Sequence, residues 1–264
     1  KRKRALELQM VISILCLVVS LVLTIIHPIF ILGFVIGMAI IVVTQKAFKH
    51  LSIDFKQTDV KNTIQKFIED AVFNPTVGMT PDDVYGSGIL KKEDRFHSED
   101  YLEGTVRGKR FKSADVHLQD VRSNGKTTTV VTVFRGRFFE IDFHKKFEHD
   151  VYIFPNLIGR FGLGKGLERI DVESIIFNKT FDVYSKDKNS AFYLLKPRFI
   201  ERLIEFQQTF KKVHYGFRDH RVYVAIDTRK DAFDLKMFKN IDDTFFKEIK
   251  DELKLIEDLI DLLS

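Results

Sequence analysis

The sequence predicts an α+β protein. A transmembrane helical hairpin at the N-terminus should precede a cytosolic, mainly antiparallel β domain with flanking helices and a long C-terminal helix. Three observations predict this class. Residues 8–44 are apolar and are interrupted once, near Pro28. Residues 103–154 alternate apolar and polar side chains, as strands do, and residues 241–264 repeat apolar side chains every three or four positions, as helices do.

The apolar N-terminal stretch has the length of two membrane helices. Residues 8–26 carry no charge and would span about 28 Å as a helix, close to the ~30 Å hydrocarbon core of a bilayer. Residues 29–44 would span about 24 Å, so we expect this helix to continue to Phe48. Pro28 lacks an amide N–H, which favours chain reversal there. A cleaved signal peptide is the alternative, but no small-residue cleavage site follows the first run and a second apolar run begins at once.

Basic side chains flank the hairpin and are missing from its turn. They are Lys1, Arg2, Lys3 and Arg4 before the first helix, and Lys46 and Lys49 after the second. Because positive charge favours the cytoplasmic side, we expect a multi-pass protein of the cell membrane with both termini and the main domain in the cytoplasm.

Small residues predict contact between the two membrane helices. Gly33 and Gly37 form a small-xxx-small pattern, which lets another helix backbone approach closely in lipid. Ser13, Cys16 and Ser20 share one face of the first helix. A dimer contact is one interpretation. We favour packing within the hairpin, because the partner helix is already tethered alongside.

The charge distribution argues against nucleic acid as a partner. The 264 residues include 42 Lys and Arg against 37 Asp and Glu, and residues 1–50 hold six of the basic groups and one of the acidic ones. Residues 51–264 therefore carry 36 of each and are neutral. Binding to a phosphate backbone needs a basic surface, which this balance does not predict.

Motifs for metal or covalent chemistry are missing from the sequence. Cys16, the single cysteine, lies in the first apolar helix, so the soluble part can have no disulfide and no Cys nucleophile. The eight histidines include no H-E-x-x-H motif, and no G-x-S-x-G motif occurs. We therefore expect no metal and no cofactor, assign no catalytic residue, and leave open whether the protein is an enzyme.

The first half of the soluble part is predicted to be a helix followed by strands. A helix over 51–73 should continue the second membrane helix, and another should begin at Thr80. Residues 123–125, Ser-Asn-Gly, predict a hairpin turn, because Asn and Gly accept positive φ. Residues 135–136 are interpreted as a second turn, and 151–154 as a separate short strand.

The second half mixes strands and helices. Residues 173–185 read as one or two strands, and Asp187 as a helix start. A helix should cover 191–210, divided at a proline. Residues 213–226 are predicted to form a hairpin that turns at 218–220.

Residues 159–166 resemble a phosphate-binding loop. They fit G-x-x-x-x-G-K, but Gly166 stands where such a loop needs Ser or Thr to bind Mg²⁺. A flexible loop is the favoured interpretation, contact with an anion such as a lipid phosphate is second, and nucleotide binding is last. The candidate residues for the anion or lipid are Arg160, Gly162, Gly164 and Lys165.

Other parts of the chain resemble a known family. The residues that carry the resemblance are Phe177, Phe181, Asp182, Val183, Asp187, 191–195, Pro197 and 199–203, with Glu103, Gly104 and 134–139 as further likenesses. They resemble a bacterial membrane family known as domain of unknown function 3137, whose members place two membrane helices before a cytosolic domain. The likeness covers residues 8–230. It implies no catalytic residue, since none is established for the family, and it implies a LemA-like membrane protein as a partner, because the genes of the two commonly lie side by side.

Residues 241–264 predict an amphipathic, acidic helix. Its apolar seam consists of Phe246, Ile249, Leu253, Ile256, Ile260 and Leu263. Eight acidic and three basic side chains make this helix negative, so anionic headgroups should repel it. The seam either docks on the chain's own domain or contacts another protein.

Two functions follow from these observations. The favoured one is a membrane-anchored interaction or scaffold module, which assembles with itself or with another membrane protein. The alternative is a domain that binds a lipid or another anion through residues 159–166 at the inner face of the membrane. For either function we place the domain limits at 1–50, 51–240 and 241–264.

Overall fold

The computed structural model describes residues 1–156, 166–210, 212–231 and 233–263. The chain divides into two compact units. Unit 1 comprises residues 1–61 and 233–248, and unit 2 comprises residues 62–232 and 249–264. The expected domain limits stay a prediction.

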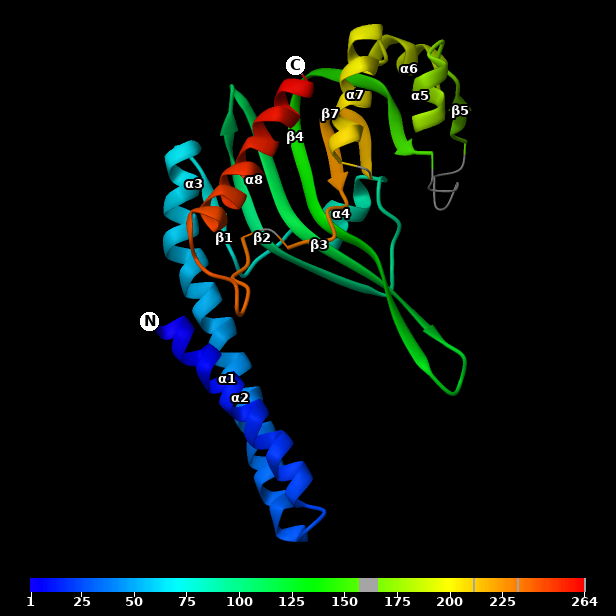
Figure 1. Cartoon of the computed structure of the whole chain (residues 1–264). Coiled ribbons are helices and arrows are strands. Elements are labelled where there is room, and N and C mark those ends of the chain that lie inside the picture. The colour runs from blue at the N-terminus through cyan, green and yellow to red at the C-terminus, as the bar shows by residue number, and fades with distance from the viewer. Residues whose placement is uncertain (157–165, 211, 232, 264) are drawn as a thin grey trace. The chain divides into compact units, whose positions relative to one another are not determined.

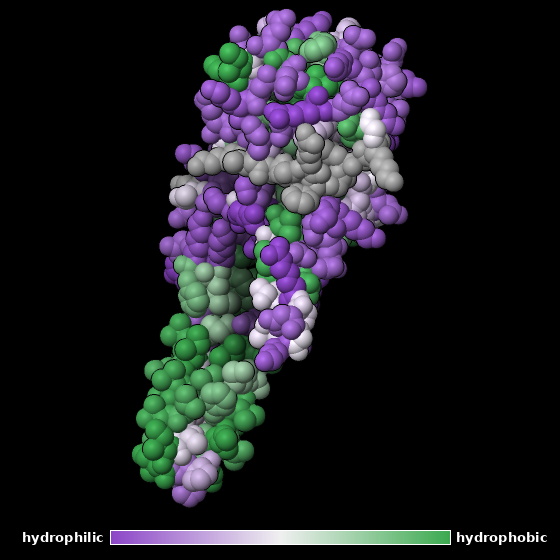
Figure 2. Space-filling model, turned by 90° about the vertical axis from the view of Figure 1, so that its right-hand side faces the viewer, coloured by the Kyte–Doolittle hydropathy of each residue, from purple (hydrophilic) through white to green (hydrophobic). Residues whose placement is uncertain are grey.

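Unit 1 contains the helical hairpin. It consists of α1 (Arg2–Leu23), the 3₁₀ turn η1 (Pro28–Phe30), α2 (Ile31–Phe55) and the π-helical turn η2 (Lys56–Val60). Pro28 occupies the first position of η1 between the two helices, so the predicted reversal is confirmed. Both helices are long and apolar enough to cross a membrane, and their surface is mostly hydrophobic (Figure 2).

Residues 233–248, the second segment of unit 1, contact the polar ends of the helical hairpin. The amide of Phe238 donates to Glu7 Oε1 at 2.7 Å, and Lys3 Nζ donates to the carbonyl oxygen of Lys239, also at 2.7 Å. Lys56 in η2 is almost fully buried and pairs with Asp234.

Unit 2 is built on one antiparallel seven-stranded sheet (Figure 1). Its strands are β1 (Val72–Asn74), β2 (Arg95–Val106), β3 (Lys109–Ser123), β4 (Thr128–Pro155), β5 (Glu168–Ile170), β6 (Phe181–Ser185) and β7 (Val213–Ile226). Its helices are α3 (Lys61–Phe67), which follows η2, α4 (Pro81–Gly86), α5 (Ile175–Thr180), α6 (Lys188–Leu194), α7 (Pro197–Thr209) and the second part of α8 (Asp243–Leu262). The predicted α+β class is confirmed.

Short polar signals set several of these elements, as predicted. Thr80 and Asp83 form a reciprocal capping box at the start of α4. Asn124 Oδ1 accepts hydrogen bonds from the amides of Lys126 and Thr127, which closes the β3–β4 hairpin. Asp187 caps α6 by accepting from the amide of Ser190 at 2.8 Å.

Three predictions of turns and strands are wrong, and each has a physical reason. The helix predicted over 51–73 also ends early, at Phe67, because residues 72–74 pair with β2 as strand β1. Residues 135–136 are no turn, because β4 runs straight through them and the strand at 151–154 is its last part. A Cβ atom at Gly136 would lie 2.0 Å from the carbonyl oxygen of Ile226, so this glycine permits close approach of β7. The predicted hairpin at 213–226 is the single strand β7, in which Asp219 has a φ of +47°.

The third wrong prediction concerns residues 173–185. Only residues 181–185 form a strand, β6. The preceding β-branched residues belong to α5, because Ser174 caps that helix by accepting from the amide of Phe177. Local capping therefore outweighs the strand preference of two adjacent isoleucines.

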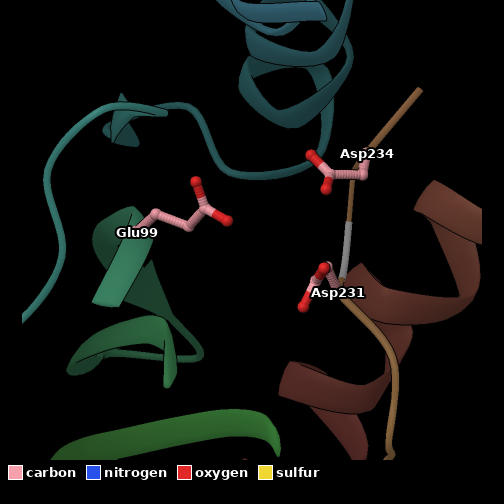
Figure 3. A group of neighbouring side chains, drawn as sticks. All are labelled: Glu99, Asp231 and Asp234. Atoms are coloured by element: carbon pink, nitrogen blue, oxygen red, sulfur yellow. The ribbon is translucent and has the colours of Figure 1, made fainter. Parts of the chain in front are cut away.

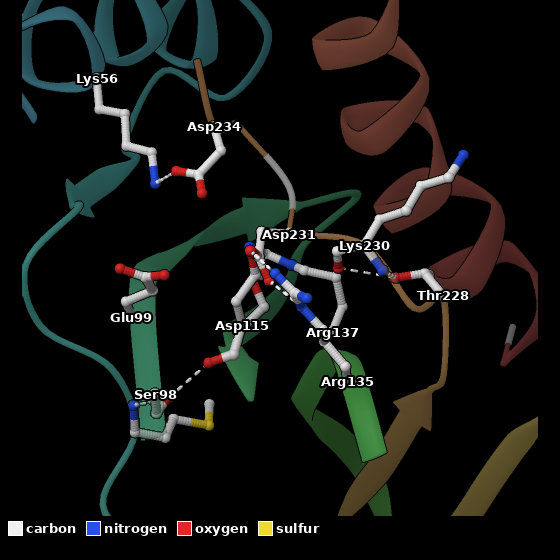
Figure 4. A network of polar contacts seen from close by, with 12 residues as sticks. Lys56, Ser98, Glu99, Asp115, Arg135, Arg137, Thr228, Lys230, Asp231 and Asp234 are labelled. Carbon is white, nitrogen blue, oxygen red and sulfur yellow. Dashed lines mark hydrogen bonds and ion pairs between the residues drawn. The ribbon is translucent and has the colours of Figure 1, made fainter. Parts of the chain in front are cut away.

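Both faces of the sheet are buried around β3 and β4. On one face, apolar residues of the segment 79–90 pack on β3, β4 and β7. On the other, Arg137 of β4 pairs with Asp115 of β3, Nη1 to Oδ1 at 3.1 Å, and donates to Ser113 Oγ at 2.7 Å (Figure 4). Arg137 and Asp115 are 2% and 5% exposed, so the pair lies out of solvent in the core of unit 2.

We expect Arg137→Ala to destabilise unit 2 by about 3–5 kcal/mol, because it removes the buried cation from the ion pair with the buried Asp115. The measurement is the thermal midpoint of the full chain in detergent, followed by circular dichroism, since the chain has no Trp. The control is Arg122→Ala, which removes the exposed pair with Asp120 and should cost less than about 1 kcal/mol. Equal midpoints for the two variants would contradict the role given to the buried pair.

Candidate functional site

The candidate site begins with an irregularity in β4. Residues Arg137 to Ile141 of β4 pair with β3 and with β7, and residues Val151 to Ile153 pair with β6 and with β7. Since a strand has two edges, β3 and β6 follow one another along the edge opposite β7. In the described residues, the stretch 142–150 of β4 pairs with neither β3 nor β6.

The same stretch is bulged with respect to β7. From Asp142 to Val151, β4 advances nine residues, while β7 advances only four, from Arg221 to Phe217. Extra residues in one strand bend it and redirect its side chains. The bulge contains the sequence Phe-His-Lys-Lys-Phe-Glu-His at residues 143–149, in which the strict alternation of the preceding strand is lost.

A cleft of about 1190 Å³ lies beside this bulge, within unit 2. Its walls are the bulge, the start of α6, the α6–α7 junction, the β2–β3 turn and the last turn of α8. The volume is somewhat larger than the roughly 300–1,000 Å³ that is typical of small-molecule sites. We name it the cation cleft after its basic side chains, which are Arg107, Lys145, Lys146, Lys196, Arg198 and Arg202.

Most of these basic groups have no acidic partner. Arg107 pairs with Asp261 of α8. For the other five cations, no carboxylate of the described residues lies within 4.0 Å. Cations gathered in a concave surface and left unpaired create a positive potential there, which attracts an anion.

Aromatic rings form a second part of the lining. Phe143 and Phe147 of the bulge stack with their centroids 5.1 Å apart, and Phe147 meets Phe217 of β7 edge-on at 5.5 Å. Phe217 in turn meets Phe199 of α7 at 6.1 Å. The four rings form a continuous apolar wall, of which Phe217 is fully buried and the other three are half-buried.

Tyr193 connects the basic and aromatic parts. Its ring lies 5.2 Å from Lys196 Nζ and 5.7 Å from Lys145 Nζ, and Lys145 Nζ donates to its hydroxyl at 3.3 Å. Contacts of this kind hold ammonium groups without neutralising them. The two lysines therefore stay available to a ligand.

The acidic side chains of the lining are Glu148, Asp187 and Asp261. Asp187 is engaged as the cap of α6, and the amide and hydroxyl of Ser190 donate to it and lower its pKa. Asp261 is engaged by Arg107. Basic groups outnumber acidic ones in the lining, so the cleft carries net positive charge.

A smaller cavity shows the opposite arrangement. It measures about 350 Å³ and lies between β2, β3, β4 and β7. Each of its three cations pairs with a carboxylate: Arg221 lies 3.3 Å and Lys112 3.8 Å from Glu140, and Arg110 pairs with Asp142 at 3.2 Å. The contrast makes the cation cleft the stronger candidate for a ligand site.

The acidic residues drawn in Figure 3 also have basic partners. Asp231 pairs with Arg135, Oδ1 to Nε at 2.8 Å (Figure 4). Asp234 belongs to unit 1 and pairs with Lys56. Glu99 lies 3.8 Å from a ring nitrogen of His97.

The residues assigned to an anion site from the sequence, Arg160, Gly162, Gly164 and Lys165, lie outside the described residues. The cation cleft was not found from the sequence. Its cations come from the turn at 107, the bulge at 143–149 and the junction at 196–202, which the fold brings together. The one available signal was the run of charged residues that interrupts the alternation of β4 after Phe143.

The small residues of the hairpin lie mostly between α1 and α2. A Cβ atom at Gly33 would approach Ser20 Oγ to 2.5 Å, and one at Gly37 would touch Leu17. Ser13 is buried, whereas Cys16 is exposed. The face of α1 that meets α2 thus contains Leu17 in addition to the two serines.

Most side chains of the apolar seam of α8 are buried in the protein. Its buried members are Ile249, Leu253, Ile256, Ile260 and Leu263, and Phe246 is half-buried. In unit 2, Lys109 Nζ donates to the carbonyl oxygen of Leu263 at 3.2 Å, next to the pair of Arg107 with Asp261. The seam is therefore covered in the single chain and is not a free surface.

Comparison with known proteins gives one family and one solved structure. The family described as "Protein of unknown function (DUF3137)" matches residues 132–264, which include most of β4, the lining of the cation cleft except Arg107, and α8. No curated protein matches the chain. The crystal structure of the mycobacterial trehalose monomycolate transport factor A, TtfA, is similar over 72% of this chain and 86% of that one, with 11% sequence identity and a TM-score of 0.39. The matched region contains the residues in the second half of the chain that carry the resemblance to this family. The chain therefore belongs to the family, whose function is unknown.

Proposed function

We propose that the protein is a membrane-anchored binding module whose unit 2 captures an anionic ligand in the cation cleft. One observation carries the proposal: five cations without acidic partners, among the described residues, line one cleft of about 1190 Å³. The apolar hairpin supports the membrane anchor. The proposal keeps the anion-binding alternative drawn from the sequence and moves it to other residues.

The lining favours binding over catalysis. Ser190, a hydroxyl that could act as a nucleophile, donates instead to Asp187, and both residues form the cap of α6. His144 and His149 also line the cleft, but in the described residues neither is within hydrogen-bonding distance of the Ser190 hydroxyl. A general base must reach the group that it deprotonates.

Assembly with itself or with another membrane protein, such as a LemA-like protein, stays a prediction. The sequence offered the α8 seam either for docking on the chain's own domain or for contact with another protein, and its side chains are mostly buried in the chain. A partner protein would therefore have to bind a different surface of the chain. If the partner's surface is acidic, the positively charged cation cleft is the described surface that complements it.

We expect the full chain, in phosphatidylcholine nanodiscs, to bind inorganic tripolyphosphate, and we expect Lys146→Glu with Arg202→Glu to weaken this binding at least tenfold. Each cation within about 4 Å of an anionic charge contributes on the order of 1 kcal/mol even at the dielectric constant of water. Titration calorimetry gives the dissociation constant, which should rise with salt.

The matched control is Lys126→Glu, an exposed lysine in the β3–β4 turn far along the sheet from the bulge. It changes the net charge without changing the cleft and should leave the dissociation constant within about twofold of the wild type. If Lys126→Glu weakens binding as much as the cleft variants do, the anion is held by overall charge and the proposal fails.

The cytoplasmic orientation of unit 2 is a separate expectation. In a Cys16→Ser background, which has no cysteine, we expect Lys126→Cys to react with a membrane-impermeant maleimide only after the cells are opened. His27→Cys, in the turn between α1 and α2, should react in intact cells. The reverse pattern of labelling would show that unit 2 lies outside.

A further inference from the structure

The cation cleft has two chemically distinct parts. Lys146, Arg198 and Arg202 supply unpaired charge. Phe143, Phe147 and Phe199 are half-buried and supply apolar surface, and the fully buried Phe217 packs behind Phe147 and Phe199. Lys109 Nζ lies 5.1 Å from the centroid of the Phe143 ring. A small inorganic anion would use only the first part and would leave the aromatic wall facing water.

A ligand that leaves the aromatic wall exposed to water gains no free energy from covering apolar surface. Half-buried aromatic rings gain about 25 cal/mol for every Å² of apolar surface that a ligand covers. A ligand that satisfies both parts must therefore carry a negative group and an apolar chain in one molecule. The Lys145–Tyr193–Lys196 contacts place charge and ring side by side, which suits the junction of such a molecule.

We infer that the cation cleft binds an amphipathic anion, a lipid-like molecule whose phosphate or carboxylate group lies against Lys146, Arg198 and Arg202 and whose acyl chain lies along the aromatic wall. This inference rests on the proposed function and specifies its ligand. The bulge of β4 is the structural feature that makes it possible, because it supplies both Lys146 and Phe147 to the same cleft.

An acidic peptide could also form ion pairs with the cations of the cleft, but its backbone would pack less favourably against the aromatic wall. Peptide N–H and C=O groups laid along aromatic rings would lose their hydrogen bonds to water without gaining new ones. An acyl chain has no such groups. The continuous series of rings therefore favours the lipid-like ligand over the peptide.

The test uses the full chain in phosphatidylcholine nanodiscs and a series of soluble probes, butyl, hexyl and octyl phosphate. Affinity should rise by up to about fourfold for each methylene that the wall covers, so octyl phosphate should bind at least tenfold more tightly than butyl phosphate. Empty nanodiscs give the partition of each probe into lipid, which is subtracted.

Variants separate the two parts of the cleft. Lys146→Glu with Arg202→Glu should weaken all three probes by a similar factor. Phe147→Asn should remove most of the dependence on chain length, so that octyl phosphate loses more affinity than butyl phosphate, whereas Phe147→Leu, which keeps an apolar side chain, should retain that dependence. Circular dichroism of each variant shows whether it is folded.

The outcomes distinguish the inference from the proposed function. If the three probes bind with equal affinity and the charge variant still loses this binding, the ligand need not be amphipathic. That outcome would overturn the inference but leave the proposed anion binding intact. Failure of every phosphate, tripolyphosphate included, would overturn both. Displacement of octyl phosphate by a Glu- and Phe-containing hexapeptide at a lower concentration than octyl phosphate itself needs would show that the cleft binds a peptide.

Discussion

The structure of unit 2 depends on one constraint: a strand has two edges, and β4 has three partners. β7 takes one edge along most of its length, so β3 and β6 must share the other in succession. Between them β4 is free to bulge, and it does so with residues 143–149. The cation cleft is the direct consequence, because a regular strand at this point would have continued the pairing and left no concave surface.

The same strand also explains the core. Between Gly136 and Ile141 β4 is covered on both faces, so even a charged side chain there is buried, and Arg137 is held by Asp115 and Ser113. Beyond Asp142 the coverage ends and the charged side chains of the bulge reach solvent. One strand thus contains a neutralised buried cation and, a few residues later, Lys145 and Lys146, which have no acidic partner among the described residues.

Sequence reasoning succeeded where a local interaction decides the structure. Thr80, Asn124 and Asp187 act on neighbouring amides, and each was recognised from its immediate neighbours. It failed where a distant contact decides. Gly136 was interpreted as a turn, although its role is to admit the carbonyl oxygen of Ile226, 90 positions away in the chain. The cleft belongs to the second class, since its cations lie on separate segments and become neighbours only through the pairing of β4 with β6 and β7.

The net charge of the sequence argues against a long polyanion as the ligand, but it does not predict whether a single anion binds. Residues 51–264 have equal numbers of acidic and basic groups, which argues against a long polyanion that needs an extended basic surface. A single anion needs only a local excess. That excess arises because many carboxylates of unit 2 are engaged elsewhere, as Asp231 is by Arg135 and Glu140 by Arg221, while the cations of the bulge and of the α6–α7 junction are not. Neutrality of the whole unit and positive potential in its cleft are therefore compatible, and the pairing pattern, which only the fold reveals, determines where an anion can bind.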